Sequence, residues 1–214
     1  MKIKNLIFAI FATASLFVAC DVIPENDRLT EVELTPSDRT VLLVEFTGNR
    51  CVNCPGAAMV AHDMLEVIPE NVVVVGMHPA GIVYTNPMDP TINLSSEDAM
   101  EYLKFYGGSQ STGLPVGVVN GRQFDDTYLQ GSSKWTAQVF AQREIAPKCL
   151  IGLNHAVEGA NHTVVATLKP QVEIESASLL FWLVESNIVG PQSIDATLVD
   201  SYQKANPNAE IDHG

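Results

Sequence analysis

Apolar runs separated by polar turns predict alternating strands and helices from Thr40 onward. Residues 40–46, TVLLVEF, are almost continuously β-branched and aliphatic, which is typical of a strand buried on both faces of a sheet. Residues 55–67 carry Ala, Met, Leu and Val at helical spacing, and residues 71–77, NVVVVGM, form a second apolar run of strand length. This order predicts a strand–helix–strand unit with parallel strands, and therefore an α/β domain.

The next stretch predicts a loop, a helix, a hairpin and a further helix. Residues 79–94 contain three prolines and are expected to form a loop, and SSEDAMEYLKFYG then begins with a serine cap. Residues 113–124, GLPVGVVNGRQF, are expected to form two short strands around an Asn-Gly turn. Residues 132–146 predict a helix that Pro147 ends.

Beyond Lys148 the hydrophobic period changes from helical to alternating. The segments CLIGLNHAVEG, NHTVVATLKP and SASLLFWLVES predict strands divided by turns, as in a small antiparallel β-sandwich-like domain over 148–214. These strands are few for a closed sandwich. Either a natural tail or an incomplete final hairpin follows Pro191.

The N-terminus has the pattern of an export signal. Two lysines precede an apolar run, residues 6–19, that is shorter than the roughly 20 residues of a membrane span, and Cys20 follows. The ending LFVAC resembles a lipobox, which implies that Cys20 is acylated and that the protein lies in an oxidising, extracytoplasmic compartment. Residues 21–35 are polar and are expected to act as a tether.

The charge balance excludes one class of partner. Of the 214 residues, 25 are Asp or Glu and 12 are Lys or Arg, which gives a formal net charge of −13. Binding to phosphate backbones needs the opposite sign, so we expect no nucleic-acid partner. Although the chain is acidic, hydrophobic residues make up 46% of it, and this composition is typical of a folded protein rather than a disordered one.

The pair Cys51 and Cys54 is the strongest candidate for chemistry. A C-x-x-C pair also supplies half of a zinc site, but Cys149, His62 and His78 show no matching spacing for the other ligands. A purely structural disulfide would close too small a loop to stabilise much. We therefore favour redox chemistry without metal or cofactor, while copper binding by the two thiols with His78 remains an alternative.

The position of Cys51 suggests how such a couple works. A thiol at the N-terminus of a helix is stabilised as thiolate by the helix dipole and free N–H groups, and Arg50 adds a positive charge. Cys51 is then the nucleophile, and Cys54, one turn further on, is the resolving thiol.

The order of elements around LLVEFTGNRCVNC resembles the thioredoxin fold over residues 36–147. The resemblance implies that Glu45 takes the place of the family's buried acid, which relays a proton to the second cysteine. Pro115 matches the family's cis-proline, which lies against the disulfide and offers backbone hydrogen bonds to a substrate. The sequence departs from the family at Arg50, where a Trp is usual, and in the Val-Asn dipeptide between the cysteines.

From Cys20 onward the chain resembles the outer membrane protein 28 related lipoproteins of Gram-negative bacteria. The likeness rests on EFTGNRCVNCP, on the strand ending in MHP, on GLPVGVVNGR and on VESNIVGPQ. It implies an outer-membrane, lipid-anchored protein that exchanges thiols and disulfides with exported proteins and with a redox partner. A surface binding or adhesion lipoprotein that keeps the fold without turnover is the alternative.

Overall fold

The computed structural model describes residues 39–206. In this range a mixed four-stranded sheet is combined with helices, and a second sheet consists of two antiparallel strands. The predicted α/β class is therefore confirmed. By their contacts, the described residues divide into a hairpin unit, 148–174, and a larger unit formed by 39–147 and 175–206.

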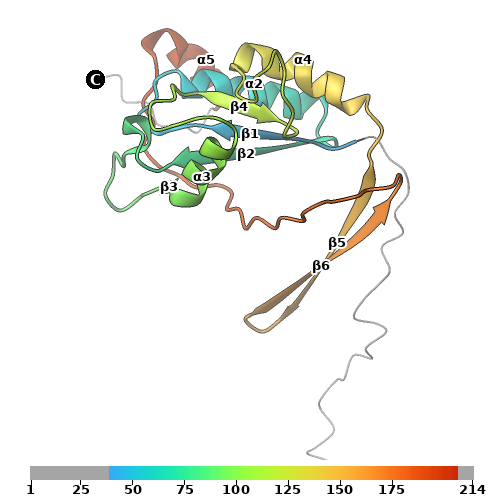
Figure 1. The fold of residues 1–214 in the computed structure, drawn as a ribbon. Coiled ribbons are helices and arrows are strands. Elements are labelled where there is room, and N and C mark those ends of the chain that lie inside the picture. The colour runs from blue at the N-terminus through green and yellow to red at the C-terminus, as the bar shows by residue number, and fades with distance from the viewer. Residues whose placement is uncertain (1–38, 207–214) are drawn as a thin grey trace, which may run out of the picture. The chain divides into compact units, whose positions relative to one another are not determined.

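The elements of the two units follow one another along the chain as labelled in Figure 1. The larger unit contains β1 (Val41–Phe46), α2 (Cys54–Val67), β2 (Val72–Pro79), η2 (Val83–Thr85), β3 (Ser95–Ser96), α3 (Glu97–Phe105), β4 (Val116–Val119), α4 (Ser132–Arg143), η3 (Ala196–Leu198) and α5 (Val199–Ala205). The hairpin unit contains β5 (Cys149–Glu158) and β6 (Asn161–Pro170).

The four-stranded sheet has the order β3-β2-β1-β4. The strands β1 and β2 are parallel, with Val41 opposite Val72, and α2 connects them. This confirms the predicted strand–helix–strand unit. The strand β4 runs antiparallel to β1 and places Val116 opposite Phe46, so β4 begins at the edge of the sheet where β1 ends.

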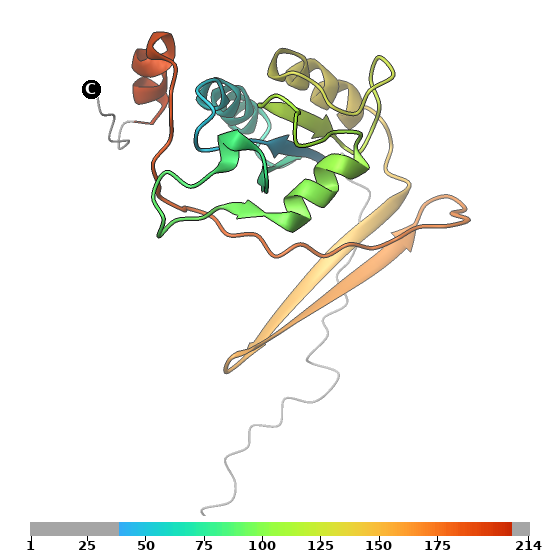
Figure 2. The same cartoon turned by 60° about the vertical axis from the view of Figure 1, so that its left-hand side comes forward.

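Two hydrophobic cores lie on opposite faces of this sheet. In Figures 1 and 2, α2 and α4 cover one face and α3 covers the other. The first core is centred on Leu43 and the fully buried Trp135, and the second on Phe46 and Leu103. Because side chains alternate along β1, its odd-numbered residues face α2 and α4, and its even-numbered residues face α3.

The predicted hairpin over 113–124 forms only in part. Asn120 and Gly121 both have positive φ, as an Asn-Gly turn requires, but no strand follows them. Asp125 and Asp126 also adopt positive φ and turn the chain again, so it returns to β4 only at an isolated bridge between Gly117 and Gln130. The predicted helix with a serine cap is confirmed. It begins at Glu97, and the Ser96 hydroxyl before it accepts a hydrogen bond from the Ala99 N–H.

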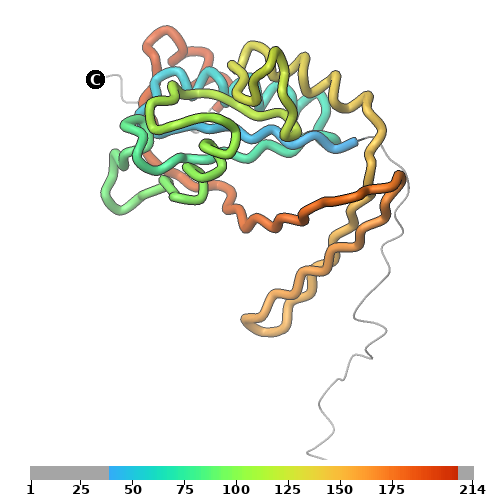
Figure 3. The backbone as a smooth tube through the Cα atoms, viewed as in Figure 1, coloured from blue at the N-terminus to red at the C-terminus, as the bar shows by residue number. Residues whose placement is uncertain are grey.

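The C-terminal segment differs most from the expected sandwich. The antiparallel strands β5 and β6 confirm the alternating pattern over 149–170, but residues 176–186 form no strand. Instead, residues 175–206 pack within the larger unit. Figure 3 shows this orange-to-red segment passing on the α3 side of the four-stranded sheet before it reaches α5 beside α2.

The described helices are all too short or too polar to cross a bilayer. The expected signal segment, tether and Cys20 lie outside the described residues.

Candidate functional site

The two cysteines are joined by a disulfide at the start of α2. After β1 ends at Phe46, the chain makes a tight turn in which the Cys51 N–H donates to the Gly48 carbonyl, and the Cys54 N–H donates to the Cys51 carbonyl. Cys54 is the first residue of α2, so Cys51 lies just before the helix rather than in its first turn. Cys51 and Cys54 are only 3% and 2% exposed.

The loop after β2 forms one wall of this site. The Arg50 N–H donates to the Tyr84 carbonyl, and the Arg50 guanidinium donates to the carbonyls of Asn86, at 2.9 Å, and Pro87, at 2.7 Å. A Cβ atom on Gly48 would collide with the Tyr84 carbonyl, so glycine is what permits this close approach. Arg50 therefore stays beside Cys51, as predicted, but its donors hold the loop.

A segment far away in the sequence covers the other side. The N–H groups of Ser193 and Asp195 donate to the carbonyls of Asn49 and Val52, at 2.7 and 2.9 Å. The Gln192 side chain donates to the carbonyls of Gly48 and Cys51, at 3.2 and 3.1 Å. We call residues 192–195 the C-terminal strap. The strap donates hydrogen bonds to main-chain carbonyls of residues 48–52, which we call the cysteine loop. Both cysteines beside these bonds are nearly completely buried.

Glu45 is the buried acid of this region. It is 5% exposed, faces the side of the sheet that α2 covers, and has one carboxylate oxygen without a hydrogen-bond partner. Desolvation raises the pKa of its carboxyl group to about 7, although a hydrogen bond with Thr47 opposes the shift. A group with this pKa can both take up and release a proton at neutral pH.

Pro115 lies at the same edge of the sheet as the cysteine loop. It directly precedes Val116, which is paired with Phe46, the last residue of β1. The Leu114–Pro115 peptide bond is cis. The fold therefore brings the predicted residues Glu45, Cys51, Cys54, Arg50 and Pro115 to one edge, where β1 ends and β4 begins.

The zinc and copper alternatives gain no support from the geometry. Among residues 39–206, the group of three potential ligands within reach of one ion is His62, Asp63 and Glu66 on the exposed face of α2, and it includes neither cysteine of the pair. His78 is the last residue but one of β2 and lines a separate groove, and burial lowers its pKa. Cys149 is a half-buried free thiol in the hairpin unit.

Comparison with known proteins identifies no family for this chain. No family model matches it, and neither does any curated protein. The crystal structure of an Agrobacterium tumefaciens protein, determined as a structural-genomics target, aligns at 18% identity with a TM-score of 0.42. The alignment covers 57% of this chain and 54% of that protein. A likeness at this level defines neither a common fold nor a common function.

The strap is the part of the site that sequence reasoning missed. The polar composition after Pro191 left a tail and an incomplete final hairpin as alternatives, because surface segments and chain ends share that composition. One local signal was present: Asp195 and Thr197 form a turn in which the Asp195 carboxylate accepts from the Thr197 N–H and hydroxyl, and this starts η3. The bonds to the cysteine loop are non-local and leave no periodic pattern.

Proposed function

We propose that this chain has a thioredoxin-like fold and acts as a thiol–disulfide oxidoreductase whose redox couple is Cys51 and Cys54. The observation that carries the proposal is the disulfide at the edge where β1 ends, together with the buried carboxyl of Glu45 on the face of the sheet that α2 covers. A structural role is a weak explanation for this disulfide, because its loop is too short to contribute much stability.

In the reducing direction, the Cys51 thiolate attacks a disulfide of the substrate. A mixed disulfide forms, and the first substrate sulfur leaves as a thiolate. The Cys54 thiolate then attacks the Cys51 sulfur, which closes the Cys51–Cys54 disulfide and releases the second substrate thiolate. Two electrons pass from the dithiol to the substrate, and the reverse sequence oxidises a substrate dithiol.

In this reaction Glu45 accepts the proton of the Cys54 thiol. The resolving thiol must lose its proton before it attacks, and it lies in a buried position where water is excluded. A carboxyl group with a pKa of about 7 accepts that proton when ionised and returns it in the opposite direction. A carboxyl with an ordinary pKa would be a poorer acceptor.

The substrate is an exported protein, and it binds at the edge formed by Arg50 and the chain before β4. By the resemblance to the thioredoxin fold, the backbone at Pro115 offers hydrogen bonds to an extended substrate segment. Acylation at Cys20 places the protein in the cell envelope, attached to the outer membrane, where a redox partner protein restores the couple. This location is the one implied by the resemblance to the outer membrane protein 28 related lipoproteins.

One observation favours the alternative of a binding or adhesion lipoprotein without turnover. Both cysteines are almost fully buried and the C-terminal strap is bonded to the loop that carries Cys51, whereas an enzyme must expose its nucleophile. A binding protein has no such need. The enzyme interpretation therefore requires the strap to open, and the two functions differ in whether covalent intermediates form.

Trapping of mixed disulfides tests the proposal. With Cys54→Ser, the mixed disulfide at Cys51 has no resolving thiol, so reducible adducts with envelope proteins should accumulate on non-reducing gels after acid quenching. Cys51→Ser is the matched control and should trap far fewer. Equal, adduct-free lanes for the two variants would reject turnover in favour of the binding alternative.

A further inference from the structure

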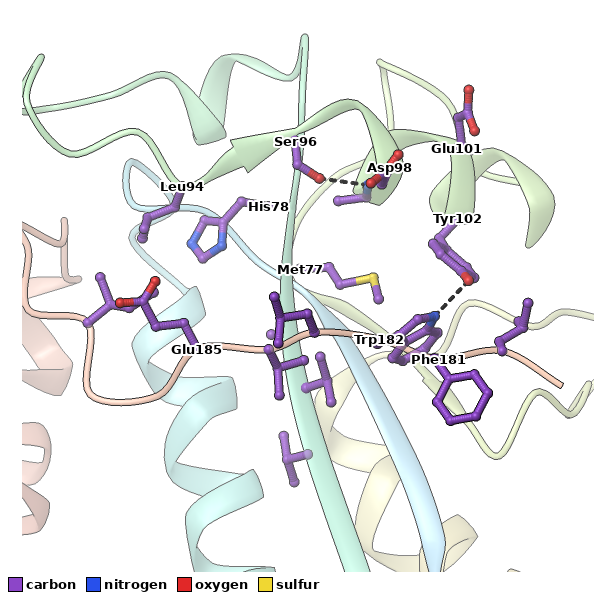
Figure 4. A pocket seen from close by; sticks show the side chains of 18 of the residues that line it. Met77, His78, Leu94, Ser96, Asp98, Glu101, Tyr102, Phe181, Trp182 and Glu185 are labelled. Carbon is purple, nitrogen blue, oxygen red and sulfur yellow. Dashed lines mark hydrogen bonds between the residues drawn. The ribbon is translucent and has the colours of Figure 1, made fainter. Parts of the chain in front are cut away.

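A groove away from the disulfide lies between β2, α3 and residues 180–188 (Figure 4). Its volume is about 1160 Å³. Its apolar and aromatic lining includes Val75, Met77, Tyr102, Phe105, Leu180 and Trp182. A groove of this size and character takes either a small ligand or several residues of a chain.

The wall formed by residues 180–188 is held in place by Trp182. Its indole N–H donates to the Tyr102 hydroxyl at 2.7 Å, and the two rings meet edge to face with centroids 5.0 Å apart. The neighbouring Leu180 is nonetheless 64% exposed, and Phe105 on the opposite wall is 77% exposed. The groove is thus bordered by apolar side chains that no other described residue covers, and such patches mark interaction sites.

The strand β2 leaves part of its backbone open beside this groove. Within residues 39–206, its outer side pairs only with β3, through His78 and Pro79. On its inner side, the Met77 carbonyl accepts from the Thr47 N–H of the segment after β1. Backbone groups alternate in direction along a strand, so the N–H and C=O groups of Val74 and Gly76 point to the open edge. An open edge of this kind binds an extended chain as an additional strand.

The charges in the groove have one sign. Asp98, Glu101 and Glu185 line it, and its described lining residues include no lysine or arginine. Burial lowers the pKa of His78, so this imidazole is neutral at neutral pH and offsets none of the negative charge. The groove therefore complements a cationic ligand, and it repels the anionic headgroups of a membrane surface.

From these features we infer that the β2 groove binds an extended peptide segment that carries apolar residues and lysine or arginine on the same face, at every second position, and that the segment adds to the open edge of β2 as a strand. Its apolar side chains contact the groove lining, while its cations face Asp98, Glu101 and Glu185. The inference is independent of the proposed redox function, because neither cysteine of the disulfide lines the groove.

A fluorescently labelled lysine-valine peptide with the repeat Lys-Ser-Val-Ser, which puts lysine and valine on one face of a strand, tests the inference by anisotropy at low ionic strength. It should bind the whole chain, whereas a peptide with glutamate in place of lysine should not. A lysine-valine peptide methylated on alternate backbone nitrogens should bind more weakly, because it cannot donate to the strand. In NMR spectra, the amide signals of Val74 and Gly76 should shift on binding and stay in place with the glutamate peptide.

Charge-reversal variants supply the matched control. Glu101→Lys with Glu185→Lys should weaken binding by about fivefold or more, the combined effect of two exposed ion pairs. Glu70→Lys with Glu144→Lys makes the same change in net charge at exposed sites outside the groove and should leave the affinity nearly unchanged. A variant with both Cys51→Ser and Cys54→Ser should bind like the native chain.

Four results would overturn the inference. The first is no binding of the lysine-valine peptide. The second is equal weakening by the two charge-reversal pairs, and the third is binding that leaves the Val74 and Gly76 signals unmoved. The fourth is binding to vesicles of phosphatidylcholine and phosphatidylglycerol that the peptide does not displace, which would assign the apolar border to a lipid surface.

Discussion

Gln192 donates its side-chain amide to the carbonyl oxygen of Cys51, from which it is separated by 141 positions in the sequence. With the backbone bonds from Ser193 and Asp195, this contact ties the C-terminal strap to the loop that carries the disulfide. Cys51 and Cys54 are themselves almost fully buried. In the proposed exchange, opening of the strap gives an attacking thiol access to Cys51.

Replacing Gln192 should therefore make the disulfide easier to reduce. Gln192→Ala removes the side-chain donations to Gly48 and Cys51 but leaves the backbone bonds of the strap. A lost hydrogen bond is worth about 1 kcal/mol, so opening and the rate of reduction by dithiothreitol should rise about fivefold. The rate is measured by alkylating the released thiols and following the mass.

The matched control for this variant is Gln171→Ala. The Gln171 side chain also donates to a carbonyl, that of Lys169, but it lies in the hairpin unit. Its removal should leave the reduction rate as it is in the native chain. If Gln192→Ala reduces no faster than the control, the strap does not limit access to the disulfide.

Glu45 should make the stability of the protein fall as the pH rises. The unfolded chain releases the Glu45 proton around its ordinary pKa of 4.5, whereas the folded chain holds it to about 7. Between these values the folded state binds more protons, so the free energy of unfolding decreases with rising pH, by about 3 kcal/mol in all. Above the folded pKa this loss is complete.

The variant Glu45→Gln should abolish this pH dependence. The free energy of unfolding is measured with urea for both proteins at about pH 4.5 and at about pH 8. The variant's value minus that of the native chain should be about 3 kcal/mol larger at the higher pH. The comparison across pH cancels the constant cost of burying the glutamine amide. A difference that is the same at both pH values would show that Glu45 is not held protonated by burial.

The sequence also predicts the attachment of the protein to the membrane. Because a short apolar run and small residues precede Cys20, mass spectrometry of the membrane fraction should find an N-terminal lipopeptide that begins at this residue. Cys20→Ser should move the protein out of that fraction. Recovery of the native chain with an unmodified Cys20 thiol would end the lipoprotein interpretation.

The sequence predicted the elements whose pattern is local. The apolar runs 40–46 and 71–77 and the helical spacing over 55–67 correspond to β1, β2 and α2, because burial on both faces of a sheet or on one side of a helix leaves a periodic trace. The C-x-x-C spacing permits the observed disulfide, although the same spacing also fits half of a metal site. These local signals placed the cysteines at a strand-to-helix corner.

Features that depend on distant contacts could not be predicted in this way. Residues 176–186 are as apolar as a strand, yet Trp182 packs on Tyr102 and the segment crosses the face of the sheet without pairing. The raised pKa of Glu45 depends on its burial in the folded chain, and the Arg50 guanidinium donates to the Asn86 carbonyl in the loop after β2. In each case the partner lies many residues away.

The reduction potential of the Cys51–Cys54 couple tests the central claim most directly. It is measured by equilibrating the protein with glutathione buffers and alkylating its thiols, in a background of Cys20→Ser and Cys149→Ser so that only this pair reacts. A catalytic couple should have a potential between about −270 and −120 mV, the range of known exchange proteins. A value below about −300 mV, typical of structural disulfides, would contradict the proposal that this pair exchanges with substrates.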